Sequence, residues 1–161
     1  MTAGMRAAVR PALTGLLCVG LAACGGSGGG NSSPTQQIQH VFASMQSAMA
    51  QGDYASACQS LSQREQATVV SGAKQAGLKA SDCAGAFSAL IKTAGVTKAQ
   101  LARAFGGGQA PKIKSVSING NHAIVTYIAT DSGKTFTETD ALVKEGGSWK
   151  ADRTISRRSG G

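Results

Sequence analysis

Apolar residues follow a helical period in the first half of the chain and a strand period in the second. Between residues 35 and 51 they recur every three or four positions and form one face of a predicted helix: Ile38, Val41, Phe42, Met45 and Met49. Gly52 is the expected end of that helix, and Asp53 is the expected N-cap of a short helix over 54–60.

Three further helices are predicted before residue 106. Ser62 and Glu65 have the capping-box spacing and open a helix that runs to about residue 76. Ser81 is the predicted cap of the next helix, and Thr97 with Gln100 marks another capping box. The helix after Ser81 has the most regular apolar face: Cys83, Ala86, Phe87, Leu90, Ile91 and Ala94.

From Pro111 onward the sequence predicts strands. Four segments rich in β-branched residues are separated by short turns: 112–118, 123–130, 135–144 and 149–155. Asn119-Gly120 predicts a type I′ hairpin turn, and Gly146-Gly147 predicts another turn. We therefore expect an α+β fold, in which N-terminal helices pack on one face of a curved four-stranded antiparallel sheet.

The first 24 residues have a different pattern. Arg6 and Arg10 precede an apolar run over 12–23, which is shorter than the roughly 20 residues that span a bilayer. The run ends in Leu21-Ala22-Ala23-Cys24, which resembles the lipobox of bacterial lipoproteins. The resemblance implies that residues 1–23 are a cleaved signal peptide and that Cys24 carries a lipid. The alternative is an ordinary secretory signal that releases a soluble protein.

The resemblance to a lipobox also determines the expected domain organisation and cellular location. Residues 24–35 are a lipidated cysteine and a flexible Gly/Ser-rich linker, 36–156 are one domain, and 157–161 are a flexible tail. The protein is expected on the extracytoplasmic face of the cell membrane, held there by the lipid on Cys24.

Processing leaves two cysteines in the domain, Cys58 and Cys83. An even pair in an oxidising compartment predicts a disulfide between them, and two free buried thiols are the alternative. These cysteines and the distant His40 and His122 lack ligand spacing, so no metal site and no cofactor are expected.

The chain is basic, with a formal net charge of +8 that falls to +6 without Arg6 and Arg10. The basic residues are dispersed and no aromatic residues are interleaved with them, so nucleic-acid binding is not expected. The dispersed charge is typical of a solvated surface. Alternatively, the basic end of the chain attracts anionic lipid or cell-wall polymer through Arg153, Arg157 and Arg158.

The domain resembles the nuclear transport factor 2-like, or cystatin-like cone, superfamily. The resemblance rests on the helix ending in Gly52-Asp53-Tyr54-Ala55-Ser56-Ala57-Cys58, on the helix carrying Cys83, on the 119–121 hairpin and on the closing segment 145–152. Within this superfamily, the domain resembles small lipoproteins of high-GC Gram-positive bacteria in particular. The resemblance implies a cone with a pocket, but members include isomerases, dehydratases and binding modules, so the fold does not specify the function.

The best candidate chemistry lies on the strand 135–144. Phe136, Glu138, Asp140 and Leu142 share one face of it, and a row of Thr, Ala and Val side chains shares the other. If the Phe136 face is inward, two carboxylates reach the cone interior or its rim and could act as acid and base. If the Thr face packs inward, or a bulge turns the strand, they do not.

Three aromatic residues are further candidates for the pocket. Tyr54 and Tyr127 could offer hydroxyls to a ligand, although packing residues with solvated tips are the alternative. Trp149 could line the pocket or anchor the last strand in the core. His40 and His122 are expected to be exposed, and His122 follows a turn.

These features support three functional hypotheses. The first is a non-enzymatic, membrane-anchored accessory domain that binds a small apolar ligand or an envelope partner. The second is a small pocket isomerase or hydrolyase that uses Glu138 or Asp140 with Tyr127. The third is a structural or dimerisation module. Which side chains enter the cone, and whether its interior is empty, distinguishes these hypotheses.

Overall fold

The computed structural model describes residues 32–105, 111–131 and 134–159. The chain divides into two units, and all of the described residues lie in the second, Asn31–Gly161. The expected signal peptide, Cys24, the glycine-rich part of the linker, the glycines at 106–108 and the turn at 132–133 lie outside the described residues.

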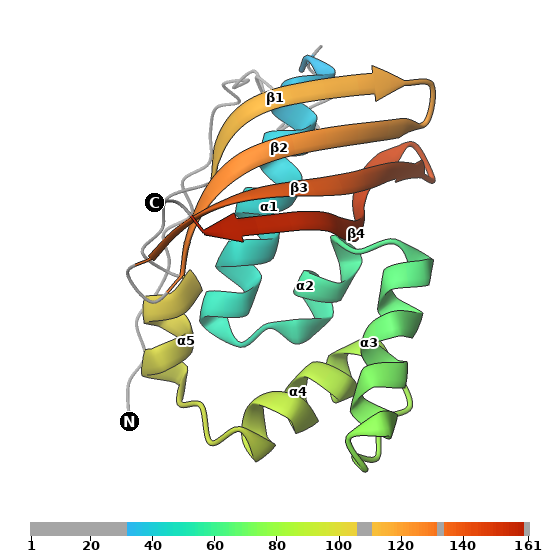
Figure 1. Cartoon of the computed structure of the whole chain (residues 1–161). Helices are drawn as coiled ribbons and strands as arrows, with labels where there is room; N and C mark the ends of the chain where they lie inside the picture. The colour runs from blue at the N-terminus through green and yellow to red at the C-terminus, as the bar shows by residue number, and fades with distance from the viewer. Residues whose placement is uncertain (1–31, 106–110, 132–133, 160–161) are drawn as a thin grey trace, which may run out of the picture. The chain divides into compact units, whose positions relative to one another are not determined.

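Helices precede strands along the chain, which confirms the α+β class (Figure 1). The helices are α1 (Pro34–Gln51), α2 (Tyr54–Gln59), α3 (Gln63–Gln75), α4 (Cys83–Thr93) and α5 (Lys98–Phe105). The strands are β1 (Lys112–Asn119), β2 (His122–Asp131), β3 (Lys134–Glu145) and β4 (Ser148–Ser159). They form one antiparallel sheet in the order β1-β2-β3-β4.

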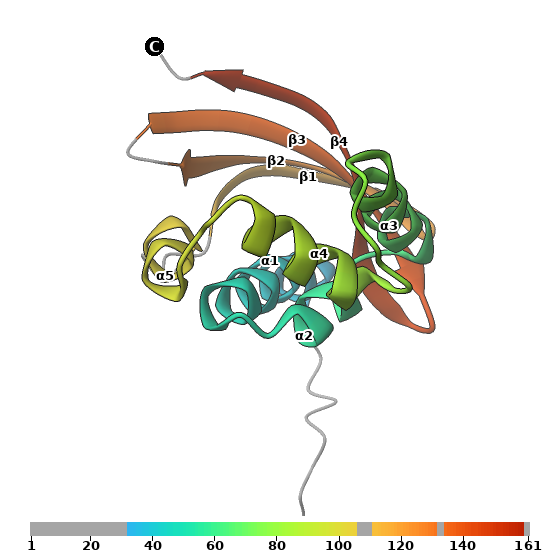
Figure 2. The same cartoon turned by 90° about the horizontal axis from the view of Figure 1, so that it is seen from below.

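The sheet bends over the helices, and α1 runs along its inner face (Figures 1 and 2). The buried side chains that fill this interface come from α1 and from strands β2, β3 and β4. They are Ile38, Phe42, Ala123, Val125, Tyr127, Leu142 and Trp149. Most of the apolar face predicted for the first helix therefore packs on the sheet, whereas Met49, at its C-terminal end, packs against Ala57 of α2.

Most predicted helix ends are confirmed by their caps. Gly52 has a φ of 72°, and the Asp53 carboxylate accepts a hydrogen bond from the backbone N–H of Ser56. The prediction for Ser81 was wrong: Asp82 caps α4, and its Oδ1 lies 2.8 Å from the backbone nitrogen of Gly85. Ser81 instead donates its hydroxyl to that carboxylate, because the charged oxygen is the stronger acceptor.

The turn of the first hairpin lies one residue later than predicted. Asn119 pairs with His122, so the two turn residues are Gly120 and Asn121, not Asn119 and Gly120. The second hairpin has the predicted turn residues, and Gly146 and Gly147 both have positive φ, as a type I′ turn requires.

The disulfide between Cys58 and Cys83 is confirmed, with the two Cα atoms 6.1 Å apart. It joins α2 to α4 within a second buried cluster that includes Leu61 and Ala151. No described helix is both long enough and apolar enough to cross a membrane.

The segment between α2 and α3 is fixed to the sheet at β4. The backbone N–H of Ser62 donates to the carbonyl of Ala151, and the N–H of Ala151 donates to the carbonyl of Ser60, each at 2.8 Å. The Asp152 carboxylate accepts hydrogen bonds from the Ser62 hydroxyl, at 2.7 Å, and from the Arg64 guanidinium. We call this group of contacts the β4 clamp.

Two β-bulges interrupt the pairing of β3 with β4. Leu142 pairs with Ala151 but Ala141 pairs with Arg153, and Asp140 pairs with Thr154 but Thr139 pairs with Ser156. Asp152 and Ile155 are the two extra residues. Asp152 is thus both a bulge residue and the acceptor of the β4 clamp.

Candidate ligand pocket

A pocket of about 360 Å³ lies between α1 and the inner face of the sheet, on the side of α5. Its walls are mainly apolar side chains from helices α1, α2, α4 and α5, from the segment after α2 and from the strand region. They are Phe42, Met45, Met49, Ala57, Leu61, Phe87, Ala104, Phe105, Pro111 and Ala129. The volume is within the range of roughly 300–1,000 Å³ that is typical of small-molecule sites.

Two sequence periods position the walls. Phe42, Met45 and Met49 lie three and four residues apart on α1, so their side chains project from the same face of that helix. Tyr127 and Ala129 alternate along β2 and therefore point to the same side of the sheet. The Phe42 and Tyr127 rings lie 4.8 Å apart and separate the pocket from the filled core.

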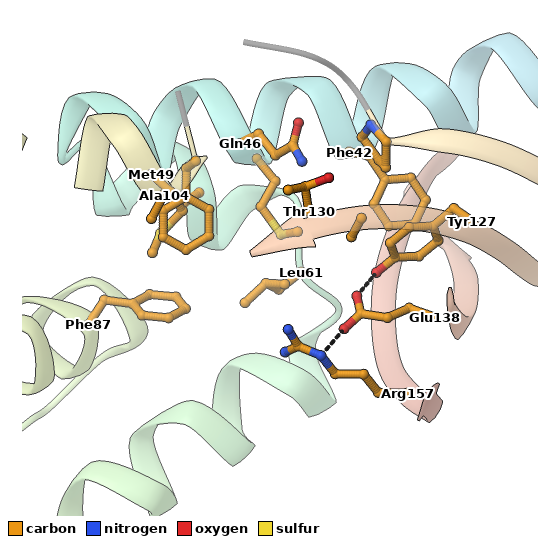
Figure 3. Close-up of a pocket in the computed structure, with 15 residues that line it drawn as sticks. Phe42, Gln46, Met49, Leu61, Phe87, Ala104, Tyr127, Thr130, Glu138 and Arg157 are labelled. Atoms are coloured by element: carbon orange, nitrogen blue, oxygen red, sulfur yellow. Dashed lines mark hydrogen bonds and ion pairs between the residues drawn. The ribbon is translucent and has the colours of Figure 1, made fainter. Parts of the chain in front are cut away.

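The charged groups of the described pocket wall lie at one end, where Tyr127, Glu138 and Arg157 form a chain of contacts (Figure 3). The Tyr127 hydroxyl donates to Oε2 of Glu138 at 2.8 Å, and Oε1 of Glu138 lies 3.0 Å from Nε of Arg157. The Arg157 guanidinium also stacks over the Phe136 ring, 4.0 Å from its centroid. Gln46 and Thr130 are the remaining polar residues along the described pocket wall.

Asp140 lies behind the Tyr127 hydroxyl and is not a wall residue. Its Oδ2 is 2.7 Å from the Tyr127 oxygen, and the residue is 7 % exposed. Burial raises the pKa of Asp140, and its hydrogen bond with Tyr127 only partly opposes that shift. Burial, together with the two nearby carboxylates, also raises the pKa of Tyr127, so its hydroxyl stays neutral.

The bulges decide which residue of β4 faces Glu138. Counting back from the hairpin pair of Glu145 and Ser148 without any bulge, Ile155 would lie opposite Glu138. The two extra residues move Arg157 into that position instead. The ion pair in the pocket therefore depends on a register that the β4 clamp helps to set.

The structure brings together most of the predicted pocket residues. The Phe136, Glu138, Asp140 and Leu142 face of β3 is the inner one, as one of the two alternatives required. Tyr127 and Glu138 line the pocket, Asp140 supports Tyr127, and Phe136 supports Arg157.

Tyr54 and Trp149, also predicted for the pocket, lie elsewhere. Tyr54 stacks on Phe87, with ring centroids 6.2 Å apart, and so supports a pocket wall from behind. Trp149 is 4 % exposed and packs in the filled core, where the Lys144 ammonium lies over its ring. Trp149 is therefore the core anchor that the sequence offered as the alternative.

Arg157 was missed as a site residue, because the run Arg157-Arg158 followed by glycines was expected in a flexible tail. In the structure β4 continues to Ser159 and contains both arginines. The helix residues Phe42, Met45, Met49, Phe87 and Phe105 were identified as apolar, but periodicity alone does not distinguish a core wall from a pocket wall.

Both histidines are exposed and lie outside the pocket. His40 contacts the Ser44 hydroxyl on the outside of α1, and His122 begins β2. Within the part of the chain that the structure describes, no three His, Cys, Asp or Glu side chains are placed to hold a metal ion.

No protein-family model, curated protein or solved structure matches this chain. The function is therefore argued from the geometry of the pocket.

Proposed function

We propose that this protein is a membrane-anchored lipoprotein of the extracytoplasmic face, whose domain binds a small apolar ligand without transforming it. The observation that carries the proposal is the apolar pocket of about 360 Å³ with an ion pair and a hydroxyl group at one end. Apolar walls supply affinity and a few placed polar groups supply orientation in small-molecule sites. The resemblance to the cone-forming superfamily is consistent with a pocket but does not distinguish binding from catalysis.

Binding fits the polar end better than catalysis does. A general base needs a carboxylate that can reach the substrate and accept its proton. Both oxygens of Glu138 already contact protein groups, and Asp140 is screened from the pocket by Tyr127. The raised pKa of Tyr127 keeps it a hydroxyl and not a phenolate base.

Binding is tested with N-phenyl-1-naphthylamine, an uncharged apolar dye whose fluorescence rises on leaving water. We expect saturable binding to the unit Asn31–Gly161, which holds every described helix, strand and buried cluster. Ala129→Phe would fill the pocket and abolish binding. The control is Ile124→Phe, which enlarges an exposed side chain on the outer face of the same strand. Equal dye binding by both variants would contradict the proposal.

The anchor is tested separately. Cys24→Ser in the full chain removes the lipid acceptor, so the variant should leave the membrane fraction of cells that express it. The readouts are the mass of the N-terminal fragment and the partition of the protein into a detergent phase. A wild-type chain without added acyl mass would contradict the lipoprotein assignment and leave the pocket proposal standing.

A second candidate function is an isomerase or hydrolyase that uses Glu138 or Asp140. The observation that favours it is the single Tyr127 hydroxyl held between the two carboxyl groups, at 2.8 and 2.7 Å. Such a hydroxyl could stabilise negative charge on a bound carbonyl oxygen. Turnover of a bound ligand that is lost in Tyr127→Phe, with binding retained, would favour this candidate over simple binding.

A further inference from the structure

Two opposite charges of the described pocket wall are paired with each other. Among the described residues of the pocket wall, Glu138 and Arg157 carry the formal charges, and they contact each other at 3.0 Å. The Glu138 side chain is only 15 % exposed, whereas the Arg157 side chain is 44 % exposed. The negative partner is thus the more enclosed of the two, and its charge is balanced before any ligand enters.

The carboxyl group of Asp140, behind the pocket, is also expected to be uncharged. Tyr127 has one hydroxyl hydrogen, but carboxyl oxygens of both Glu138 and Asp140 lie within hydrogen-bonding distance of its oxygen. With Glu138 in the ion pair, the arrangement is completed by a proton on Asp140, which then donates to Tyr127 while Tyr127 donates to Glu138. Burial raises the pKa of Asp140 and favours this neutral acid.

We infer that the pocket selects an uncharged amphiphile, with an apolar body against α1, α4 and α5 and one hydroxyl or carbonyl group at the Glu138–Arg157 pair. This inference rests on the proposed function and specifies its ligand class. Each carboxylate oxygen can accept a second hydrogen bond, so a ligand hydroxyl group can donate to Glu138 without breaking the ion pair. A ligand carbonyl group can accept from the Arg157 guanidinium in the same way.

A charged ligand adds a charge that the Glu138–Arg157 pair does not balance. A carboxylate at this end would lie close to Glu138 and compete with it for Arg157, and an ammonium group would lie close to Arg157 and compete for Glu138. Separating this pair leaves the more enclosed Glu138 carboxylate without compensation, which is unfavourable. The Glu138–Arg157 pair therefore discriminates against charged ligands in addition to joining β3 to β4.

The test compares three probes with the same ten-carbon chain at pH 7: decan-1-ol, decanoate and decylamine. Affinities for the unit Asn31–Gly161 are measured by isothermal titration calorimetry below the aggregation limit of each probe. Decan-1-ol should bind at least about tenfold more tightly than either ion, a difference of about 1.4 kcal/mol.

Charge variants separate pocket selectivity from the general preference of apolar sites for neutral molecules. Glu138→Gln keeps the shape of the side chain and leaves positive charge at the pocket end, so decanoate should gain about tenfold relative to decan-1-ol. Arg157→Gln leaves negative charge there, so decylamine should gain by a similar factor and decanoate should not.

Two controls change the same charges away from the pocket. Arg158→Gln acts on the next residue of β4, which pairs with Thr137 on the outer face of the sheet. Glu145→Gln acts at the far end of β3, where the carboxylate accepts from the backbone N–H of Gln63. Neither control should change the ratios of probe affinities.

The outcomes are distinguishable. Decanoate or decylamine binding as tightly as decan-1-ol, or probe ratios that the Glu138 and Arg157 variants leave unchanged, would overturn the uncharged-ligand inference while pocket binding stands. If none of the three probes binds to the wild-type protein, the proposed function fails, and the inference fails with it.

Discussion

The interface between α1 and the sheet has two halves that differ in how they are filled. At the end with the β1–β2 and β3–β4 turns, the interface is filled by Val125, Leu142 and Trp149, each at most 4 % exposed. At the α5 end, Phe105 is 37 % exposed and the same helix and sheet enclose a pocket of about 360 Å³. We call these the closed half and the open half; one supports the fold, and the other leaves volume for a ligand.

The two halves meet at Tyr127. Its ring packs on Phe42 in the closed half, while its hydroxyl contacts Glu138 in the open half. They are also coupled through β4, because the bulge residue Asp152 contributes to the β4 clamp and shifts Arg157 into register with Glu138. Tyr127 and Asp152 therefore contribute both to stability and to the geometry of the pocket.

The largest expected contrast comes from truncating one apolar side chain in each half. Leu142→Ala in the closed half should lower the free energy of unfolding by about 2–5 kcal/mol, because it leaves a cavity where Leu142 is 1 % exposed. Phe105→Ala in the open half should cost about 1 kcal/mol or less. Urea denaturation measures both, and equal losses would contradict the division into two halves.

The disulfide supports the helical wall of the open half, because its buried cluster includes the pocket residue Leu61. Replacing both Cys58 and Cys83 by Ala opens a loop with a sequence separation of 25 residues and should cost about 3 kcal/mol in the chain-entropy model. The comparison with wild type under non-reducing and reducing conditions checks this value. Addition of reductant should destabilise the wild type alone; an effect of similar size on the double variant would contradict the assignment.

The β4 clamp should have an intermediate effect. Asp152→Ala leaves the hydroxyl of Ser62, which is 0 % exposed, without its acceptor, so we expect a loss of about 1–3 kcal/mol. Arg64→Ala removes only the half-exposed cation and should cost about 1 kcal/mol or less. Equal losses in the free energy of unfolding would show that the hydrogen bond of the buried Ser62 hydroxyl does not account for the stability of the clamp.

The smallest effect is expected at the boundary between the halves. Because burial raises the pKa of Asp140, the folded protein keeps this proton to higher pH than the unfolded chain does. The stability due to Asp140 is thus complete below the unfolded pKa of about 4 and declines as pH rises through the folded value.

The substitution Asp140→Asn replaces the carboxyl group by an amide that does not titrate. The variant should therefore gain stability relative to wild type as pH rises, by on the order of 1 kcal/mol. Urea denaturation at several pH values between about 4 and 8 measures the difference. A variant that instead loses stability relative to wild type towards the upper end of this range would show that Asp140 is ionised in the folded protein.

The closed half could be predicted from sequence more fully than the open half. The spacing of Ile38 and Phe42 on α1 and the β-branched runs of the strands predicted the layers, because burial imposes a period on every element. Capping residues such as Asp53 and Thr97 predicted helix ends for the same local reason. The Cys58–Cys83 pair followed from counting the cysteines that remain after the predicted processing, for a protein expected in an oxidising compartment.

The open half depends on features that no local pattern encodes. The ion pair of Glu138 and Arg157 requires two bulges and a strand that continues through Arg157-Arg158, where the sequence resembles a tail. Phe87 and Phe105 have the same helical spacing whether they meet other side chains or enclose a pocket. Periodicity predicts which face is buried, but it does not predict how completely the buried volume is filled.

The most direct test of the two-halves account uses methyl groups as local reporters. Met45 and Met49 line the pocket, whereas Val125 and Leu142 lie in the closed half. In methyl-labelled protein titrated with decan-1-ol, we predict saturable NMR shifts of the Met45 and Met49 signals and unchanged Val125 and Leu142 signals. No shift at either methionine, or parallel shifts at all four residues, would contradict an open half beside a closed one.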